Sequence, residues 1–225
     1  MEYRNITIAY WERTILRDIN LLIEPGEFVF LIGTSGSGKT SFIKSLLWAK
    51  KLKSGCIIDD NWTDISEFTP KELLEYRRSL GIIFQDFKLL PKKTVRENVA
   101  FAMEVCGYNS YEITRRVPEV LAKVWLLAKK ETFVETLSWW EIQRTCIARA
   151  LIHDPQIIIW DEPTGNLDRN NATEIMHLLN ELNQSGKTVI MATHDETIVN
   201  SMKKRVIAFE DGKIVSDKEW WSYCL

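Results

Sequence analysis

Two stretches near the N-terminus alternate apolar and polar positions, a pattern typical of strands with one buried face. Residues 3–8 and 15–23 follow this two-residue period and predict an antiparallel pair of strands. Residues 56–58 predict a short third strand. We therefore expect an antiparallel β subdomain at this end of the chain.

Four other runs are apolar throughout, as is typical of parallel strands that a sheet buries on both faces. These runs are residues 28–32, 82–84, 157–160 and 189–192. Between the last two, helical spacing places four apolar residues on one stripe, namely Ile175, Leu178, Leu179 and Leu182. A helix is also predicted over residues 70–78, because Thr69 and Glu72 form a capping box around Pro70. Strands that alternate with helices in this way predict an α/β core.

The region between the second and third apolar runs is different, because residues 95–150 show helical periodicity and hold few strand candidates. We expect a single domain over residues 1–225. Within it, residues 1–87 and 151–225 are predicted to form the core and the β subdomain. Residues 88–150 are predicted to form an inserted α-helical subdomain.

Composition narrows the class of protein. The formal net charge of −2 gives no reason to expect a nucleic-acid partner, because such binders are held largely by positive charge. The four cysteines are scattered and form no Cys-x-x-Cys, which predicts reduced thiols rather than disulfides or a zinc site. No apolar run approaches the ~18 residues of a membrane span, so any membrane role is expected to come through a partner.

The most specific motif is a Gly-x-x-x-x-Gly-Lys-Thr phosphate loop between the apolar run 28–32 and an amphipathic stretch. The loop and the residue after it are Gly33, Thr34, Ser35, Gly36, Ser37, Gly38, Lys39, Thr40 and Ser41. Its glycines let backbone N–H groups turn toward the phosphates of ATP, and the following helix adds its positive end. Lys39 is expected to reach the β- and γ-phosphates, and the Thr40 hydroxyl to hold Mg²⁺.

Candidate catalytic residues follow three of the apolar runs, at the strand ends where ligands bind in open α/β sheets. Asp161 is expected to hold Mg²⁺, and Glu162 to orient and deprotonate the attacking water. His194 follows the last run and is placed to reach a γ-phosphate. Gln85 follows the second run and is placed to reach the metal or the water.

The order of these motifs resembles the nucleotide-binding domain of ABC ATPases over nearly the whole chain. The motifs are the phosphate loop, Gln85, Leu137-Ser138-x-x-Glu141, Asp161-Glu162, Asp168 and His194. Residues 84–91, 94–99 and 161–168 are more similar still to the FtsE group of cell-division ATPases. The alternative is the ATPase of a lipoprotein- or macrolide-type exporter, because those groups share the Pro-Thr-Gly-Asn-Leu-Asp of residues 163–168.

The resemblance implies a P-loop NTPase fold of the ABC type and two copies packed head to tail. Each ATP then lies between the phosphate loop of one copy and the signature segment of the other. In this sequence that segment holds Ser138, Trp139, Trp140 and Glu141. The resemblance also implies that Asp168 signals across the dimer interface. Tyr10 would stack on adenine, the alternative being an aromatic side chain that packs on a neighbouring strand.

A transmembrane partner is also implied by the resemblance. It would be an FtsX-like subunit that docks near residues 85–91 and passes ATP-driven closure to cell-wall hydrolases outside the cell. The chain is accordingly expected at the cytoplasmic face of the cell membrane, where the partner holds it as a peripheral subunit.

The signature segment departs from the family at Trp139 and Trp140, where ABC ATPases have two glycines. Those glycines let backbone N–H groups at a helix N-terminus approach the γ-phosphate of the other copy closely. Two indoles would fill that space and hold the dimer open. The signature as written therefore predicts weak binding in one half-site and very slow hydrolysis. The alternative function is an ATP-binding scaffold without turnover.

Several of the nine tryptophans stand where the family or a turn favours glycine, so the sequence leaves open whether these positions are tryptophan or glycine in the source cell. The nine are Trp11, Trp48, Trp62, Trp125, Trp139, Trp140, Trp160, Trp220 and Trp221, and none has the sequence context of a core residue. Glycine is scarce, at 10 of 225 residues or about 4% against a usual ~7%. One hypothesis is that codons UGA, read as glycine in the source cell, have been translated as tryptophan. The alternative is a genuinely degenerate signature.

Overall fold

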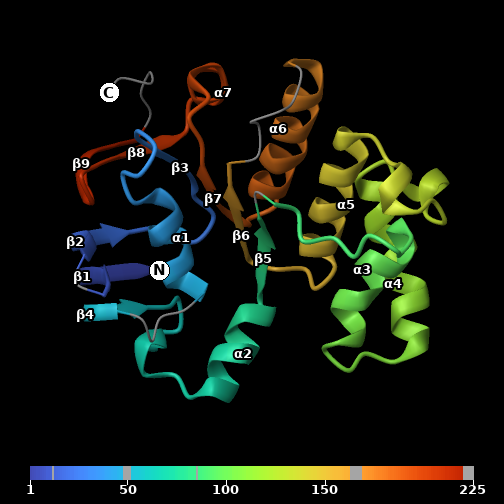
Figure 1. Ribbon diagram of the computed structural model, residues 1–225, viewed down its shortest axis with the longest axis horizontal. Coiled ribbons are helices and arrows are strands. Elements are labelled where there is room, and N and C mark those ends of the chain that lie inside the picture. Colours follow the sequence, from blue (N-terminus) through green and yellow to red (C-terminus); the bar gives the residue numbers. More distant parts are fainter. Residues whose placement is uncertain (12, 48–51, 85, 163–168, 220–225) are drawn as a thin grey trace.

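The computed structural model describes residues 1–11, 13–47, 52–84, 86–162 and 169–219 (Figure 1). Its N-terminal part is a three-stranded antiparallel sheet in the order β2-β1-β4. The strands are β1 (Glu2–Tyr10), β2 (Arg13–Leu22) and β4 (Leu52–Ile58). The predicted antiparallel β subdomain is therefore confirmed.

A six-stranded sheet in the order β5-β6-β7-β3-β8-β9 forms the centre of the molecule. Its strands are β3 (Phe28–Ile32), β5 (Leu80–Ile83), β6 (Ile157–Asp161), β7 (Thr188–Ala192), β8 (Arg205–Glu210) and β9 (Lys213–Lys218). The first five in this order are parallel, and β9 pairs antiparallel with β8. The four apolar runs form β3, β5, β6 and β7 as predicted. The pattern did not predict β8 and β9, whose apolar residues stand among charged ones.

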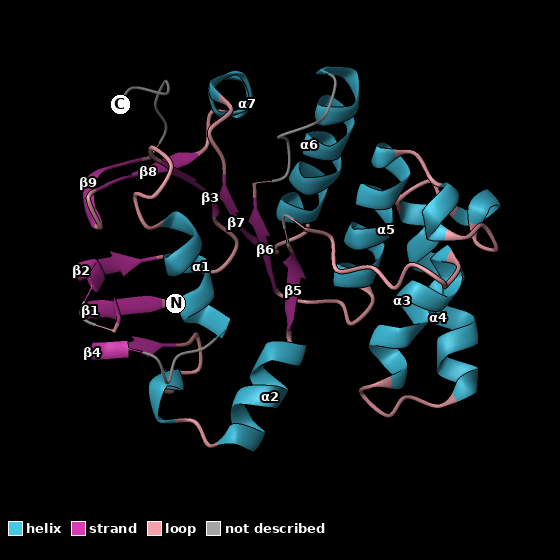
Figure 2. Ribbon diagram, viewed as in Figure 1, coloured by secondary structure: helices cyan, strands magenta, loops and turns pink. Residues whose placement is uncertain are grey.

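Helices surround the six-stranded sheet. They are α1 (Lys39–Leu47), α2 (Pro70–Arg78), α3 (Val95–Glu104), α4 (Ser110–Lys123), α5 (Trp139–Leu151), α6 (Arg169–Gln184) and α7 (Glu196–Met202). The α1 helix contacts both β2 and β6, so it lies between the two sheets. The α3, α4 and α5 helices pack on one another beyond the β5 edge, far from the three-stranded sheet (Figure 2). This is the expected α/β architecture with an inserted helical subdomain, while its boundaries at residues 88 and 150 stay a prediction.

Four of these helices begin with a capping box. The capping residues are Thr69 for α2, Thr94 for α3, Asn109 for α4 and Ser138 for α5, each paired with a glutamate three residues later. In each case the side-chain oxygen of the capping residue accepts from a backbone N–H of the first turn, and the glutamate accepts in return. The predicted start of α2 at Pro70 is confirmed.

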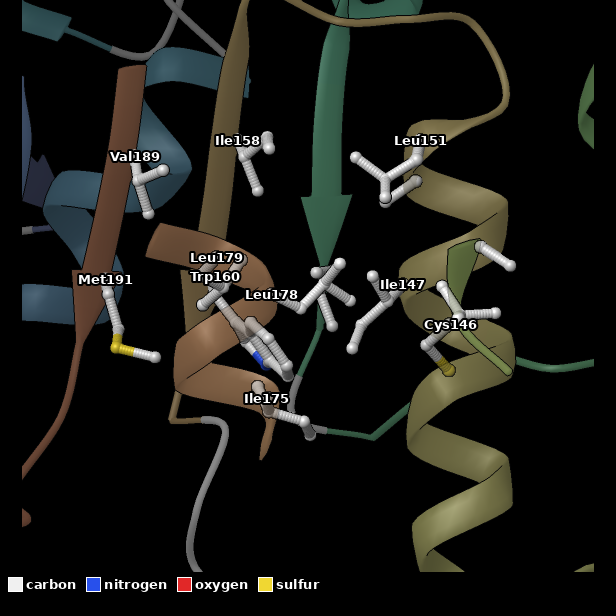
Figure 3. Packing of buried hydrophobic residues seen from close by; sticks show 14 of the residues in the cluster. Cys146, Ile147, Leu151, Ile158, Trp160, Ile175, Leu178, Leu179, Val189 and Met191 are labelled. Atoms are coloured by element: carbon white, nitrogen blue, oxygen red, sulfur yellow. The ribbon is translucent and has the colours of Figure 1, made fainter. Parts of the chain in front are cut away.

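The core lies on both faces of the six-stranded sheet, because its strands β3, β6 and β7 bury every side chain. Along β6, Ile158 and Trp160 face one cluster of buried residues, while Ile159 faces the other. The indole of Trp160 is only 1% exposed and packs with residues of α6 (Figure 3). This corrects the expectation that no tryptophan is a core residue: β6 is buried on both faces, so any side chain at position 160 is enclosed.

Two further expectations concern the membrane and the thiols. Across the described ranges, no helix combines the length and apolar character that crossing a membrane requires. Cys56, Cys106 and Cys146 are free thiols, and Cys224 lies outside the described residues.

Candidate nucleotide-binding site

The order of the parallel strands brings the predicted site residues to one edge of the sheet. Neighbouring strands β3, β7 and β6 end at the phosphate loop, at His194 and at the Asp161-Glu162 pair, respectively. Backbone hydrogen bonds continue the sheet past the strand ends, since Glu162 N donates to Ala192 O at 2.9 Å. Segments more than 150 residues apart in sequence therefore meet at the carboxyl ends of the strands, the position at which such sheets bind ligands.

The phosphate loop is enclosed so tightly that only glycine fits at two of its positions. A Cβ at Gly33 would lie 2.3 Å from Phe209 O, and a Cβ at Gly38 would lie 2.5 Å from the Leu16 side chain. Both glycines also have positive φ, at 143° and 113°. The β8–β9 turn closes over the loop, where Gly212 N donates to Ser37 O at 3.1 Å. The loop is therefore fixed by packing against β2 and β8 rather than by its own bonds alone.

The donors at this loop fit the phosphates of a nucleotide. Ser37 Oγ is buried and has no hydrogen-bond partner within the described part of the chain. Lys39 Nζ donates to two loop carbonyls, Gly33 O at 2.7 Å and Thr34 O at 3.1 Å. The first N–H groups of α1 have no partner within the helix and point into the loop. Burial lowers the pKa of Lys39, and the carboxylates of Glu162 and Asp161 oppose that shift.

A pair of oxygen ligands suitable for Mg²⁺ lies beside the loop. Thr40 Oγ1 donates to Asp161 Oδ1 at 3.2 Å, which joins the start of α1 to the end of β6. Burial raises the pKa of the Asp161 carboxyl, and the hydrogen bond from Thr40 opposes that shift. Mg²⁺ is commonly held by one or two protein oxygens together with phosphate oxygens, so these two residues suffice for the protein's share of the ligands.

The candidate base and the candidate γ-phosphate sensor are neighbours. Glu162 Oε1 lies 3.8 Å from His194 Nδ1 across the gap between β6 and β7. The Glu162 backbone, directly after the last residue of β6, has a φ of 52°, an unusual conformation for a glutamate. Such strain is found where function fixes the direction of a side chain.

An open cavity of about 440 Å³ lies over the phosphate loop. Its described lining residues are Arg13, Ile15, Ser35, Gly36, Gly38, Lys39, Thr40, Ser41 and Glu162. Sequence reasoning missed Arg13 and Ile15, which β2 contributes from the other sheet. The predicted strand over residues 15–23 included Ile15, whereas Arg13, the cross-strand partner of Tyr10, lies outside both predicted strands. Tyr10 itself is half-exposed and does not line the cavity, so its adenine-stacking role stays a prediction.

The signature segment does not reach this cavity, since no described lining residue comes from residues 137–141. Ser138 caps α5: Ser138 N donates to Glu141 Oε2 at 3.0 Å, and Glu141 N donates to Ser138 Oγ at 3.4 Å. Trp139 and Trp140 are the first two residues of the helix. The exposed Trp139 ring lies edge-on to Phe87 at 4.5 Å, and Trp140 lies over the Arg144 guanidinium at 4.0 Å. The two indoles thus occupy the helix end that an opposite phosphate would approach.

Two predicted site residues, Gln85 and Asp168, lie outside the described residues. The same is true of Trp48, Trp220 and Trp221. The structure describes residues 86–91, the rest of the segment expected to dock a membrane partner.

Three of the tryptophans that the structure describes have the backbone conformation of glycine. Trp11, Trp62 and Trp125 have φ values of 56°, 62° and 56°. This left-handed region is favoured by glycine and is unusual for a bulky side chain. All three side chains are exposed, with Trp11 at 102% and Trp62 at 80%. Packing therefore gives no reason for an indole at Trp11 or Trp62.

Comparison with known proteins gives a consistent assignment along the chain. The family described as ABC transporter matches residues 16–165. The cell division ATP-binding protein FtsE of Streptococcus pneumoniae strain D39 is 47% identical over 224 residues, which are 99% of this chain and 97% of that protein. FtsE of Bacillus subtilis strain 168 is 50% identical over 208 residues, covering 92% of this chain and 91% of that protein.

Solved structures agree with these relatives. A dimeric post-hydrolysis state of the ATP-binding cassette MJ0796, bound to ADP and Pi, superposes with a TM-score of 0.88 at 32% identity, covering 99% of each chain. The cbiO1 protein of Clostridium perfringens superposes with a TM-score of 0.88 at 30% identity, covering 97% of this chain and 87% of that one.

Proposed function

The chain belongs to the ABC transporter family, and we propose that it is the ATP-hydrolysing subunit of a membrane complex that acts in cell division. The observation that carries the proposal is the strand order β6-β7-β3, which joins the phosphate loop, the Asp161-Glu162 pair and His194 at one sheet edge. The FtsE relatives at 45–50% identity, which are named for cell division, support the biological setting.

The described residues divide the chemistry among them. The phosphate loop and Lys39 bind the β- and γ-phosphates of ATP, while Thr40 and Asp161 hold Mg²⁺, which would neutralise charge on the phosphate oxygens. Glu162 accepts a proton from the attacking water. His194, whose Nδ1 lies 3.8 Å from Glu162 Oε1, contacts the γ-phosphate. Gln85 completes this group in the proposal as the residue that contacts the metal or the water.

The active unit is a pair of copies packed head to tail. Support comes from the open cavity over the phosphate loop, to which residues 137–141 of the same copy contribute nothing that is described. The relatives of known structure include dimeric cassettes. In the pair, Ser138 and the first turn of α5 of one copy face the γ-phosphate bound by the other, and Asp168 lies at the interface between them.

We infer further that the nine tryptophan positions are glycine in the living cell. The left-handed backbones of Trp11, Trp62 and Trp125 support this. Trp139 and Trp140 cover the helix N-terminus that must approach a phosphate. Trp160 gives no such support, because its indole fills a core position. The codon at each position shows whether the residue there is tryptophan or glycine. UGG codons at positions 139 and 140 would refute the inference for the two signature residues on which hydrolysis depends.

Steady-state ATP hydrolysis tests the proposed function. The chain as written is compared with a form in which all nine tryptophans are replaced by glycine. We expect turnover in the glycine form and a loss of about 10²–10³-fold for each missing phosphate donor in the written form. Negligible turnover in both forms, with the glycine form shown to be folded by circular dichroism, would leave only the ATP-binding scaffold. Mass spectrometry of the protein from its source cell supplies an independent check on the residues.

An FtsX-like transmembrane subunit is the proposed partner, docked near residues 85–91 at the cytoplasmic face of the cell membrane. The identity to FtsE proteins supports it over a lipoprotein- or macrolide-type exporter. Co-purification from the source cell separates the two. A four-span partner with one large extracellular loop is expected, and an exporter permease would overturn this choice of partner.

A further inference from the structure

The turn that follows position 85 holds an unusual backbone. Phe87 and Lys88 are consecutive non-glycine residues with positive φ, at 58° and 50°. The left-handed conformation is unfavourable for L-residues and is normally visited one residue at a time. Two local bonds close the turn, from Phe87 N to Phe84 O at 3.1 Å and from Lys88 N to Asp86 O at 2.6 Å. Something outside the turn must hold it in place.

Arg149 of α5 supplies that contact. Its two terminal nitrogens donate to consecutive carbonyls of the turn, Nη1 to Lys88 O and Nη2 to Phe87 O, both at 2.5 Å. Cys146, one turn earlier on the same helix, donates its thiol to Phe87 O at 3.5 Å. Burial lowers the pKa of the guanidinium, because the group is withdrawn from water to reach these carbonyls. A fork of two charged donors fixes both the position and the orientation of the peptide planes.

A second buried side chain holds the next part of the same segment. Asn98 of α3 is fully buried, and its amide bonds both polar atoms of the Leu90 backbone, accepting from N at 2.7 Å and donating to O at 3.1 Å. Residues 87–90 are thus tied to α5 at one end and to α3 at the other. The helical region, rather than the six-stranded sheet, determines where this segment lies.

We propose that Arg149 is a positioning residue that joins the partner-docking turn to the signature helix, so that the two move as one unit. This rests on the proposed function, since it takes residues 85–91 as the docking segment. The same helix has Ser138 as its N-cap, and its residues rise about 1.5 Å each, so the backbone of Arg149 lies roughly 15 Å along α5 from the signature. A displacement of the turn by a membrane partner is therefore transmitted to the signature through one rigid helix.

The contact does not depend on the tryptophans. Trp139 also touches Phe87, with ring centroids 4.5 Å apart, but the Arg149 fork binds backbone carbonyls from the third turn of α5. The joint therefore persists in the glycine form, in which Trp139 is absent.

Hydrogen exchange of the full chain tests the joint without any need for ATP turnover. In Arg149→Met, which keeps the stem and removes the fork, we expect the amides of residues 86–93 to exchange about ten- to hundredfold faster. Arg149→Lys can restore one charged donor and should fall between the two. Arg116→Met is the matched control, because its Nε donates to the single carbonyl of Ile152, at 3.1 Å, elsewhere in the same helical region. It should leave residues 86–93 unchanged.

Unchanged exchange of residues 86–93 in Arg149→Met would overturn the proposal, as would an equal increase in Arg116→Met. If Arg149→Met does not fold, Arg149→Lys decides alone, and wild-type exchange in that variant would overturn the proposal. In the glycine form, Arg149→Met should lower kcat for ATP hydrolysis while leaving KM for ATP in place, because the phosphate loop is untouched. If the proposed function is wrong, no variant will hydrolyse ATP. The hydrogen exchange of residues 86–93 can still be compared between the variants, so the two failures are distinguishable.

Discussion

Replacing Trp62 with glycine should make the protein more stable, the reverse of the usual effect of removing a large apolar side chain. Trp62 has a φ of 62° and is 80% exposed, so the substitution relieves backbone strain and gives up little buried area. In the folded state, a left-handed backbone destabilises a bulky L-residue by about 1–2 kcal/mol. Glycine avoids that strain, but its greater conformational freedom in the unfolded chain lowers the stability by about 0.5–1 kcal/mol. The net expectation is a gain of about 0.5–1 kcal/mol.

Trp11 offers an independent copy of the same test, since its φ is 56° and its side chain is fully exposed. The two positions lie beyond opposite ends of β1, so their effects should add. Urea denaturation is the assay, with thermal unfolding as a second measurement. For a chain of 225 residues, the double variant should gain about 1–2 kcal/mol, or roughly 2–8 °C in Tm.

Trp160→Ala is the contrasting control, because its indole is 1% exposed and its removal should cost about 3–5 kcal/mol. A loss of stability in Trp62→Gly and Trp11→Gly comparable to that control would refute the reasoning. It would mean that both indoles make stabilising contacts despite their exposure.

Three further outcomes are expected. Lys39→Ala should abolish ATP binding measured with a fluorescent nucleotide, and binding of ordinary strength would contradict the role of the phosphate loop. In the glycine form, Glu162→Gln should bind ATP and accumulate as a dimer in size-exclusion chromatography with light scattering, whereas rapid turnover would exclude Glu162 as the base. The backbone hydrogen bond from Thr94 lowers the pKa of Glu97 from an ordinary 4.5 to about 2. Because this folded-state pKa is lowered, its stabilising contribution is present above about pH 4.5 and is lost as the pH falls toward 2. Glu97→Gln should remove that component from the pH dependence of Tm, and an unaltered profile would show that Glu97 does not contribute it.

Patterns that depend on one local rule were predictable from the sequence. The fully apolar runs became β3, β5, β6 and β7, and the capping box at Thr69 starts α2 as predicted. Close approach of Asp161 and Glu162 to the phosphate loop followed from the rule that parallel strands end at one edge of a sheet. Arg13 was not predictable in this way, because its place at the cavity depends on how two sheets pack together.

Burial of Trp160 was also beyond local reasoning. A side chain at the end of β6 is enclosed by α6, which begins after the strand, and no local pattern reports that packing. The fork from Arg149 was missed for a related reason. It joins residues about 60 positions apart through backbone carbonyls. Because every residue has a backbone carbonyl, the types of residue at positions 87 and 88 do not reveal the contact.

The closing of Gly212 over the phosphate loop has a consequence for synthesis of the chain. The phosphate loop is synthesised early. The strands that pair with β3, which are β7 and β8, and the Gly212 amide that donates to Ser37 O are all synthesised much later. About 175 positions separate Ser37 from Gly212, which a ribosome adds in about 9–35 s at ~5–20 residues per second. During that interval the nascent chain carries the whole nucleotide motif without its supports. We therefore expect tight ATP binding only after the β8–β9 hairpin has left the ribosome.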